Sequence, residues 1–304
     1  MKTDLVVPKE VELEHFLNQL RELCWAASDV LIAYSRGEDP PYGFPKNLTV
    51  EEGGDGPVSA ADLAVNELLM SRLKEDFPLV KWGILSEEST KEKTFKKREN
   101  KEDWQWILDP LDGTKDFLQG LENYAVHLAL AYKKKPKIGI VLIPEKDELW
   151  FGIIGMGAWY ENREGIRKSV EFSKRKEISE LVVVSSKNHQ EKILVNLLRE
   201  IDFGQTKNIG SVGCKVASIL RGESDVYISL SGETSPKDWD MAAPHALIQA
   251  AGGLFTHADG TSLSYEEPDY SQKGCLIASH GVSHQNIIKR VMSFLAAKEP
   301  NYIV

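Results

Sequence analysis

Two aspartates at close spacing follow an apolar run in this 304-residue chain. Asp109 and Asp112 stand in the hexapeptide DPLDGT, directly after WQWIL. Pro110 favours an extended conformation for the residue before it, and Gly113 permits a sharp bend. In such a bend both carboxylates and the Leu111 carbonyl can converge on one side, and oxygens gathered in this way suit a hard cation such as Mg²⁺. A plain Asp-Pro and Asp-Gly turn is the alternative, but the complete hexamer after a buried strand favours the metal site.

The other side of the same turn could hold an anion. Gly113 and Thr114 begin a stretch that we expect to be helical, and N–H groups at the start of a helix point towards a bound anion. Without a cation the two carboxylates would repel each other, and the pKa of one of them would rise. The turn could therefore hold a metal on its acidic side and a phosphate on its amide side.

Three further segments place acidic residues at the ends of predicted elements. Glu87 and Glu88 follow the predicted strand KWGIL, a position where α/β proteins build sites. Asp62 stands just inside a predicted helix in SAADLAVN, and Asp240 stands near the start of another in KDWDMAAPHALIQAAGG. Each has an ordinary explanation when taken alone, as a solvated turn acid or a complement to a helix dipole. Together with DPLDGT, they favour a site for more than one metal ion.

The composition disfavours several classes of protein. Hydrophobic residues make up 42% and charged residues 27% of the chain, as in ordinary globular proteins. No apolar run reaches the roughly 18 residues needed to span a bilayer. The net charge of −9 disfavours binding to nucleic acid. The basic run over residues 91–101 is interrupted by acids and is expected to be a solvated loop.

The cellular location is predicted from the first residues and the cysteines. The start, MKTDLVVPKEVELEHF, resembles neither a signal peptide nor a transit peptide. Cys24, Cys214 and Cys275 lie far apart without metal-ligand spacing, and we expect them to be reduced thiols in the core. A cytoplasmic protein is therefore predicted.

The apolar spacing predicts two α/β-type halves with a border near residues 165–180. In the first half we expect helices and strands, with a loop over 38–58 between the helices: helices over 9–36 and 60–74, then strands over 81–85, 104–108, 124–132, 137–143, 148–154 and 159–162. In the second half strands alternate with helices: strands over 181–185, 225–230 and 275–279, helices over 189–201, 211–221, 239–250 and 284–296. We therefore expect an N-terminal α+β domain over 1–175 and a C-terminal α/β domain over 176–304.

Four segments resemble, in order, a known superfamily. SAAD, LSEES, WILDPLDGTKDF and DWDMAAPHALIQAAGG are similar to motifs of the lithium-sensitive, Mg²⁺-dependent sugar phosphatases. This superfamily includes inositol monophosphatases, fructose 1,6-bisphosphatases and 3′(2′),5′-bisphosphate nucleotidases. The match runs from the first helix to about residue 280. It implies an α/β fold of alternating αβαβα layers, with an α+β N-terminal half.

Two details resemble the bisphosphate nucleotidases in particular. Lys115, Asp116 and Phe117 follow DGT, where inositol monophosphatases usually show a Thr-Asn-Phe-like sequence. The segment GSVGCKVASILRGESDVYISLSG, which contains Lys215, is also similar to the nucleotidases. Some nucleotidases carry an arginine near the position of Ser229, and its absence weakens the assignment of a contact to a second phosphate.

The resemblance implies a set of metal ligands. Glu87, Asp109 and the Leu111 carbonyl would hold one Mg²⁺, and Asp109 would bridge to a second ion held also by Asp112 and Asp240. A third, weaker ion would use Glu87. The implied cofactor is thus two or three Mg²⁺ ions, one of which Li⁺ would replace.

The resemblance also implies catalytic and substrate-binding residues. Asp62 and Thr114 match the pair that activates the attacking water. His189, Ser211 and Lys215 match positions that contact the nucleotide. Each of these three also has a structural explanation: a solvated histidine, a helix N-cap and a surface lysine.

The implied function is removal of the 3′-phosphate from adenosine 3′,5′-bisphosphate, which gives AMP and phosphate. The sulfated form of the nucleotide is a second candidate substrate, and the implied role is clearance of a by-product of sulfate assimilation. Inositol monophosphates or fructose 1,6-bisphosphate are the alternatives within the same metal chemistry, and a non-catalytic metal-dependent binding protein is the alternative outside it. The Gly/Pro-rich acidic segment 38–57 is either a mobile lid over the site or an exposed linker. Nothing in the sequence indicates an oligomeric state.

Overall fold

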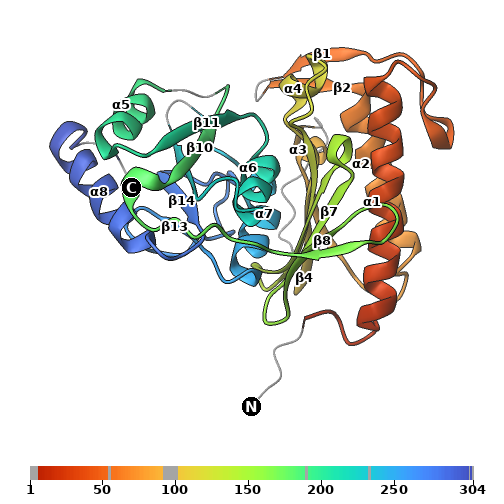
Figure 1. Ribbon diagram of the computed structural model, residues 1–304. Helices are drawn as coiled ribbons and strands as arrows, with labels where there is room; N and C mark the ends of the chain where they lie inside the picture. Colours follow the sequence, from red (N-terminus) through yellow and green to blue (C-terminus); the bar gives the residue numbers. More distant parts are fainter. Residues whose placement is uncertain are drawn as a thin grey trace.

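The helices and sheets of the protein form five alternating layers. The computed structural model describes residues 6–53, 56–91, 102–188, 191–231, 234–300 and 302. Figure 1 shows an outer layer of helices, a large sheet, an inner layer of helices, a smaller sheet and a second outer layer of helices. The predicted αβαβα layering is confirmed.

The large sheet has seven strands in sequence order, among the residues described. Its first two strands run parallel, and all later neighbours are antiparallel. Helices cover both faces of its centre, which explains why its central strands read as nearly continuous apolar runs. The strands are β3 (Gly83–Ser86), β4 (Trp104–Asp112), β5 (Ala125–Tyr132), β6 (Lys135–Ile143), β7 (Glu148–Ile153), β8 (Gly157–Glu161) and β9 (Arg167–Ser169).

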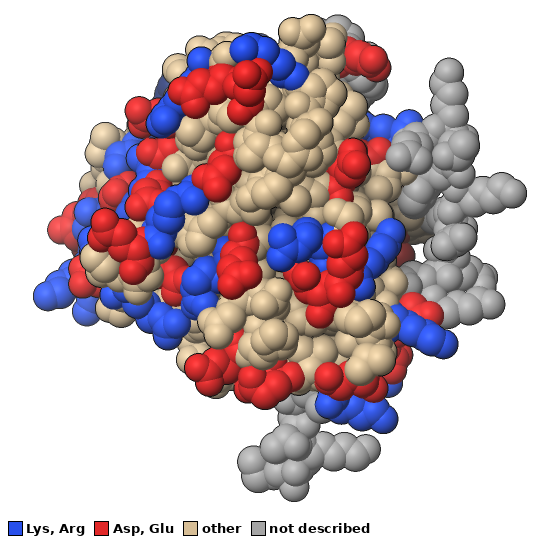
Figure 2. Space-filling model, turned by 90° about the vertical axis from the view of Figure 1, so that its right-hand side faces the viewer, with Lys and Arg blue, Asp and Glu red and all other residues tan. Residues whose placement is uncertain are grey.

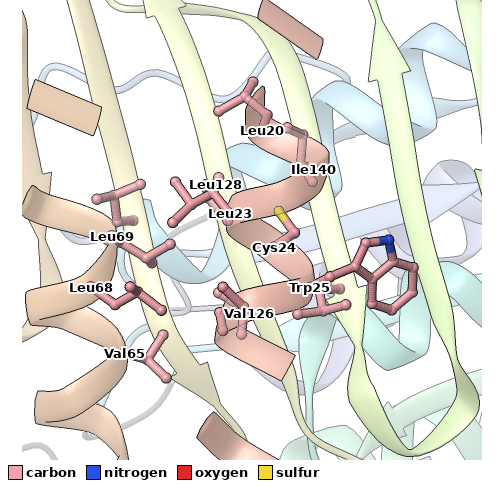
Figure 3. Packing of buried hydrophobic residues seen from close by; sticks show 14 of the residues in the cluster. Leu20, Leu23, Cys24, Trp25, Val65, Leu68, Leu69, Val126, Leu128 and Ile140 are labelled. Atoms are coloured by element: carbon pink, nitrogen blue, oxygen red, sulfur yellow. The ribbon is translucent and has the colours of Figure 1, made fainter. Parts of the chain in front are cut away.

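Helices α1 (Leu13–Ser35) and α2 (Ala60–Glu75) cover the outer face of the large sheet. Their apolar faces meet side chains of β5 and β6 in one buried cluster. Figure 3 shows this packing for Leu20, Leu23, Cys24, Trp25, Val65, Leu68, Leu69, Val126, Leu128 and Ile140. Acidic and basic side chains alternate over the solvent side of this helical layer (Figure 2).

Helices α6 (Val212–Leu220) and α7 (Asp238–Ala250) form the middle layer between the sheets. Two glycines of the large sheet allow α7 to approach its backbone. A Cβ atom on Gly139 would lie 2.3 Å from the Ala243 carbonyl oxygen, and one on Gly152 would lie 2.7 Å from the Leu247 Cα atom. This close approach fixes the position of α7 relative to the large sheet.

The smaller sheet has the strand order β11-β10-β12-β14-β13. The pairs of β10 with β11 and β12 are parallel, and the pairs of β14 with β12 and β13 are antiparallel. Two helices cover its outer face. These elements are β10 (Val182–Ser186), α5 (Lys192–Ile201), β11 (Gln205–Ile209), β12 (Val226–Leu230), β13 (Leu254–His257), β14 (Cys275–Ser279) and α8 (His284–Lys298).

The structure contains several elements that we did not predict. Part of the expected loop over 38–58 is a β-hairpin, in which β1 (Val50–Gly53) pairs with β2 (Gly56–Ser59). Strands β9, β11 and β13 were also missed. The helix α3 (Glu87–Lys91) and 3₁₀ turns at Pro41–Gly43, Pro144–Lys146 and Ile178–Glu180 were also not predicted, whereas α4 (Thr114–Leu118) is the helix expected after Gly113.

Two predictions about the whole chain can be compared with the structure. All three cysteines are buried and unpaired, as predicted. None of the helices within the described ranges has the length and apolar character that crossing a membrane requires. The division into domains over 1–175 and 176–304 stays a prediction.

Candidate active site

The parallel pairing of β3 and β4 brings Glu87 and Asp109 together. Ser86 pairs with Leu108, so the next residue of each strand lies at the same edge of the sheet. The Asp109 side chain is buried, and its carboxyl lies within hydrogen-bonding distance of that of Glu87. Burial, followed by the charges of Glu87, Asp112 and Asp240, raises the pKa of Asp109 well above its usual value.

The DPLD segment is a bulge inside β4, where we had expected the strand to end at Asp109. Asp109 pairs with His127 and Asp112 pairs with Ala125, so β4 has one residue more than β5 between these pairs. Proline is tolerated at such a bulge because its missing N–H is not needed for the ladder. The Leu111 N–H instead donates to Asp109 Oδ1 at 3.0 Å. The bulge therefore turns the two aspartates to one side, as the predicted bend would have done.

Gly113 ends this segment in a conformation that other residues rarely adopt. Its φ is +96°, and a Cβ atom there would lie 2.9 Å from the Asn123 carbonyl oxygen. The short helix α4 starts at the next residue, Thr114, as expected.

The Asp112 carboxylate lies at the N-terminus of α6. Its Oδ2 atom accepts hydrogen bonds from Ser211 Oγ at 2.6 Å, from the Val212 N–H at 2.6 Å and from the Gly213 N–H at 3.1 Å. Burial alone would raise the pKa of Asp112, but His127 together with other partners outweighs it and holds that pKa below the ordinary value. Asp112 is thus held as an anion in the metal-free protein.

Asp240 comes from the first turn of α7. Its Oδ2 atom accepts a hydrogen bond from the Lys237 N–H at 2.5 Å. Carboxylate oxygens of Asp109, Asp112 and Asp240 all lie within 4.8 Å of one another. Burial, then the charges of Asp112 and Glu87, raises the pKa of Asp240 to about 8. Acidic oxygens that are crowded in this way, one of them buried and two partly buried, form a donor set that a hard divalent cation fits.

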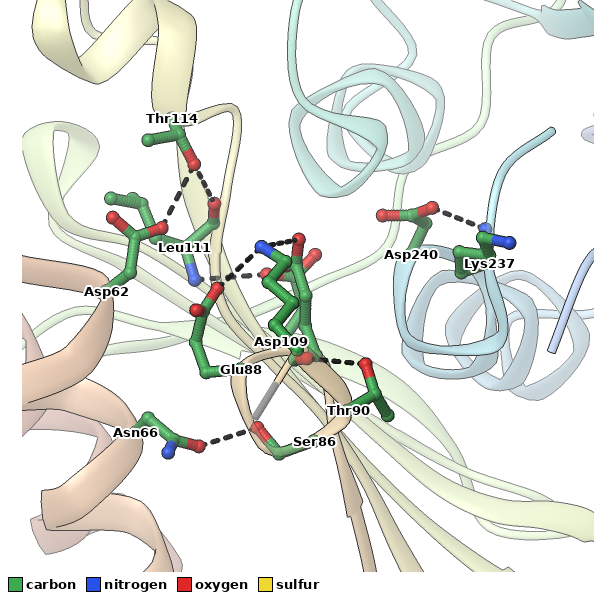
Figure 4. Close-up of polar contacts among 12 residues, drawn as sticks. Asp62, Asn66, Ser86, Glu88, Thr90, Asp109, Leu111, Thr114, Lys237 and Asp240 are labelled. Atoms are coloured by element: carbon green, nitrogen blue, oxygen red, sulfur yellow. Dashed lines mark hydrogen bonds and ion pairs between the residues drawn. The ribbon is translucent and has the colours of Figure 1, made fainter. Parts of the chain in front are cut away.

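Asp62 and Thr114 form a second, adjacent pair. The Thr114 hydroxyl lies 3.0 Å from Asp62 Oδ1 and 3.0 Å from the Leu111 carbonyl oxygen. Asp62 Oδ2 accepts from the Ser59 N–H at 2.7 Å and from Ser59 Oγ at 2.5 Å, which closes a capping box at the start of α2. Burial raises the pKa of Asp62 to about 6, against the hydrogen bonds from Ser59. Figure 4 shows this pair on one side of Asp109 and Asp240 on the other.

One cavity of about 480 Å³ opens onto Thr114 and the carboxylates of Glu87, Asp109, Asp112 and Asp240. It extends from the carboxylates to the ends of β10 and β12 in the smaller sheet. Its lining includes Glu87, Asp109, Leu111, Asp112, Gly113, Thr114, Lys115, Asn188, Glu191, Leu194, Lys215, Tyr227, Ile228, Ser229, Leu230, Lys237 and Asp240. Sites that sequence reasoning placed in both halves of the chain therefore share one cavity.

The three predicted nucleotide contacts have different positions. Lys215 is buried, lines the cavity and donates from Nζ to the Gly210 carbonyl oxygen at 2.8 Å, with Nζ also 5.2 Å from the Tyr227 ring centroid. Burial lowers the pKa of Lys215, although Asp112 opposes that effect. Ser211 is buried behind Asp112 and caps α6 by accepting from the Cys214 N–H at 3.2 Å. His189 lies outside the described residues.

Two residues of the site were missed in the sequence. The Nε2 atom of His127, a buried residue, lies 3.2 Å from Asp112 Oδ2. A single histidine inside the apolar run AVHLALAY was the signal that could have found it. Lys91 forms ion pairs with Glu87 and Glu88, and only its position three and four residues after these acids in a one-turn helix could have indicated this contact.

Comparison with known proteins identifies the family. The model of the inositol monophosphatase family matches residues 12–295, so the chain belongs to this family of metal-dependent phosphoric monoester hydrolases. The chain is 31% identical over 251 residues to the 3′(2′),5′-bisphosphate nucleotidase CysQ of Salmonella typhimurium, covering 82% of this chain and 93% of that protein. An inositol-1-monophosphatase of Mesorhizobium japonicum is 28% identical over 266 residues, with 84% and 91% covered.

A solved structure supports the fold independently. The inositol monophosphatase of Anabaena superposes with a TM-score of 0.71 over 94% of this chain and 100% of that chain, at 24% sequence identity. The resemblance predicted from SAAD, LSEES, DPLDGT and the Trp-Asp segment is therefore confirmed.

Proposed function

We propose that the chain is a Mg²⁺-dependent 3′(2′),5′-bisphosphate nucleotidase. Its substrate is adenosine 3′,5′-bisphosphate, which it converts to AMP and phosphate, and the sulfated nucleotide is a second substrate. The observation that carries this proposal is that one cavity has crowded carboxylates at one end and the buried Lys215 in its wall. The similarity to the Salmonella nucleotidase supports the nucleotide as substrate.

The metal ligands that we propose are five. Glu87, Asp109 and the Leu111 carbonyl hold one Mg²⁺, and Asp109, Asp112 and Asp240 hold a second, with a third and weaker ion at Glu87. The crowding of carboxylate oxygens within 4.8 Å supports this assignment. Bound Mg²⁺ supplies the positive charge that offsets a phosphate monoester and makes water more acidic. This explains how a chain with a net charge of −9 binds a phosphate.

Asp62 and Thr114 act on the attacking water in this proposal. The Thr114 hydroxyl, which lies between Asp62 and the Leu111 carbonyl, orients the water through a hydrogen bond. The water would give its proton to the Thr114 oxygen while the Thr114 hydroxyl passes its own proton to Asp62 Oδ1, which already accepts from it. The pKa of about 6 suits Asp62 to act as the final base at neutral pH. The N–H groups of Gly113 and Thr114 contact the phosphate.

Lys215 supplies a fixed positive charge for the nucleotide in this proposal. Its Nζ atom is held by the Gly210 carbonyl and lies over the Tyr227 ring, so little conformational entropy is lost when an anion binds. Contacts from His189 and Ser211 to the nucleotide are further proposals. For Ser211 the observed hydrogen bond to Asp112 favours a supporting role instead.

Four properties of the whole protein complete the proposal. The chain folds as two domains, over 1–175 and 176–304, and acts in the cytoplasm on a small nucleotide. The segment 38–57, which includes the β1–β2 hairpin, acts as a lid, and the position of Pro57 in the cavity wall supports this. Amide hydrogen exchange in that segment should slow when Mg²⁺ and AMP are added, and unchanged exchange would argue for a linker.

Inositol 1-phosphate is the second candidate substrate. The Mesorhizobium inositol-1-monophosphatase covers as much of this chain as the nucleotidase does. Ser229 lies in the cavity wall near the position where some nucleotidases carry an arginine, so the second phosphate has one cation fewer than in those proteins.

A substrate panel tests the proposal. Mg²⁺-dependent phosphate release is measured side by side on adenosine 3′,5′-bisphosphate, its sulfated form, inositol 1-phosphate and fructose 1,6-bisphosphate. Asp109→Asn should abolish release from all of them, while Asp29→Asn, which removes a surface carboxylate paired with Arg163, should not. A preference for inositol or fructose phosphate would overturn the substrate but keep the metal site. Full activity of Asp109→Asn would overturn the metal site itself.

A further inference from the structure

Helix α3 carries a lysine directly onto the acidic site. Lys91 Nζ lies 2.8 Å from Glu87 Oε1 and 2.9 Å from Glu88 Oε1. The three residues share one face of a single helical turn, because positions three and four apart are neighbours on a helix. One ammonium group therefore joins both carboxylates.

The two glutamates cannot be treated as ordinary surface acids. The Glu88 side chain is 3% exposed, and the Glu87 side chain is 18% exposed and lines the cavity. Glu87 also contacts the carboxyl of Asp109, which lies within the cluster of three aspartates. Removing carboxylates from water is costly unless a cation accompanies them, so an ion pair in this position stabilises the metal-free protein.

The same contact opposes a metal ion at Glu87. An ammonium group and a divalent cation at one carboxylate repel each other, and Glu87 Oε1 is already occupied by Lys91. Lysine has a flexible four-carbon stem, and its side chain is 23% exposed here, so the ammonium group can withdraw towards solvent. The contact is thus one that metal binding can break.

We propose that Lys91 is an internal counter-ion of the metal-free site, which a metal ion displaces from Glu87 when it binds. Because the metal ion must break this ion pair when it binds, the free energy of the ion pair is subtracted from the free energy of metal binding. Lys91 accordingly weakens the affinity for the ion held by Glu87 and lets that ion exchange at ordinary metal concentrations. This inference rests on the proposed metal site, but it assigns a role to a residue outside the proposed ligands.

The test measures binding of Mn²⁺ alone, followed by the electron paramagnetic resonance signal of the free ion. Lys91→Met removes the charge and keeps a side chain of similar length. The matched control is Lys133→Met, which removes an equal charge from an exposed lysine paired with Asp103 at 3.9 Å, at the opposite end of β4. Lys91→Met should tighten the weakest Mn²⁺ site by about tenfold, the change expected when one adjacent positive charge is removed near the surface. Lys133→Met should leave the affinity within about twofold of the original.

A second measurement checks the other half of the argument. Without metal, the thermal unfolding midpoint of Lys91→Met should lie below that of the original protein, and saturating Mn²⁺ should reduce this gap because bound metal stabilises the folded state. Lys91→Gln, which keeps a hydrogen-bond donor but no charge, should show the same tightening and guards against a folding defect specific to methionine. Lys91→Arg should resemble the original protein.

The outcomes separate this inference from the proposed function. Unchanged or weaker Mn²⁺ binding by the folded Lys91→Met and Lys91→Gln variants would overturn the inference while leaving the metal site intact. Absence of Mn²⁺ binding by the original protein would instead overturn the proposed metal site. Neither result depends on which phosphate ester is the substrate.

Discussion

Replacing Asp62 by asparagine should separate catalysis from stability. The asparagine side chain can turn its oxygen towards Ser59 and keep accepting from the Ser59 N–H and hydroxyl, so the capping box at the start of α2 survives. The amide nitrogen then faces Thr114 and donates to its hydroxyl, which reverses the hydrogen bond seen with Asp62 Oδ1. The variant keeps the geometry of the pair but has no carboxylate to receive a proton.

The size of both effects follows from the structure. Loss of a positioned general base reduces kcat by about 10²- to 10⁴-fold. Burial raises the pKa of Asp62 from 3.8 to about 6, so ionising this carboxylate costs the folded state about 3 kcal/mol. This cost is fully present above the folded pKa and disappears as the pH falls below the unfolded one. At about pH 8, the free energy of unfolding of Asp62→Asn should therefore equal that of the original protein or exceed it by up to about 3 kcal/mol.

The matched control is Ser59→Ala, which should show the reverse pattern. It removes the N-cap hydroxyl that bonds the Ala61 N–H and Asp62, at a cost of about 1 kcal/mol, but it keeps the carboxylate. The assays are phosphate release under saturating Mg²⁺ and urea unfolding at the same pH. An Asp62→Asn variant with kcat within about tenfold of the original would refute the role of Asp62 as base. A loss of stability larger than that of Ser59→Ala would refute the preserved capping box.

Three further predictions concern stability. Burial lowers the pKa of His245 from 6.5 to about 4, so the unfolded state binds a proton first as the pH falls. The free energy of unfolding should therefore drop by about 1.4 kcal/mol for each pH unit between these two values. In urea unfolding this drop should be smaller in His245→Phe, and an identical drop would contradict the prediction. Gly113→Ala should lower the free energy of unfolding by at least about 1 kcal/mol and remove most activity, because φ is +96° and the new Cβ atom would meet the Asn123 carbonyl oxygen. An unchanged thermal unfolding midpoint would contradict this prediction. Chelation of metal by EDTA should lower the unfolding midpoint of the original protein but not that of Asp240→Asn, because this variant lacks one of the crowded carboxylates. An equal response of both proteins would exclude Asp240 as a metal ligand.

The elements with strong apolar patterns were predictable from the sequence. The first helix was expected over 9–36 and runs over Leu13–Ser35, and the strand expected over 137–143 runs over Lys135–Ile143. Helix α1 and strand β6 bury apolar side chains in the same cluster between the outer helices and the large sheet, so periodicity and burial agree. The fold of the N-terminal half can be predicted from local sequence because most strands of the large sheet pair with their sequence neighbours.

The missed elements share a different property. Strand β11, with the sequence QTKNI, is an edge of the smaller sheet and is largely exposed, so no apolar alternation marks it. The hairpin formed by β1 and β2 pairs only with itself among the described residues and carries the sequence VEEG opposite GPVS. Edge and two-stranded pairings are stabilised by backbone hydrogen bonds more than by burial, and a residue pattern alone does not reveal them.

The candidate site was predictable in part. Glu87 and Asp109 follow neighbouring parallel strands, so their proximity could be argued from the sequence once both strands were recognised. Asp240 arrives through the packing of α7 against the large sheet, about 130 residues later in the chain. Its position at the start of a predicted helix suggested a shared metal site with DPLDGT, but only the resemblance to a family indicated which ligands it would join. His127 was missed because its partner Asp112 comes close only through the pairing of β4 with β5. Lys91 was missed because it begins a charged run that we expected to be a solvated loop, although its partners Glu87 and Glu88 are close in sequence.

The middle layer of helices explains why one site needs both halves of the chain. Helix α6 presents its N-terminal N–H groups to Asp112, and the first turn of α7 supplies Asp240, while the strand that carries Asp109 and Asp112 belongs to the large sheet. The helix that approaches the sheet at Gly139 and Gly152 therefore also sets the distance between the carboxylates. A bulky residue at either glycine would displace α7 and with it Asp240. A substitution in the core would therefore change the geometry of the site, because α7 moves as a rigid helix. In this protein the contact between α7 and the large sheet thus determines both the packing of the core and the spacing of the acidic oxygens.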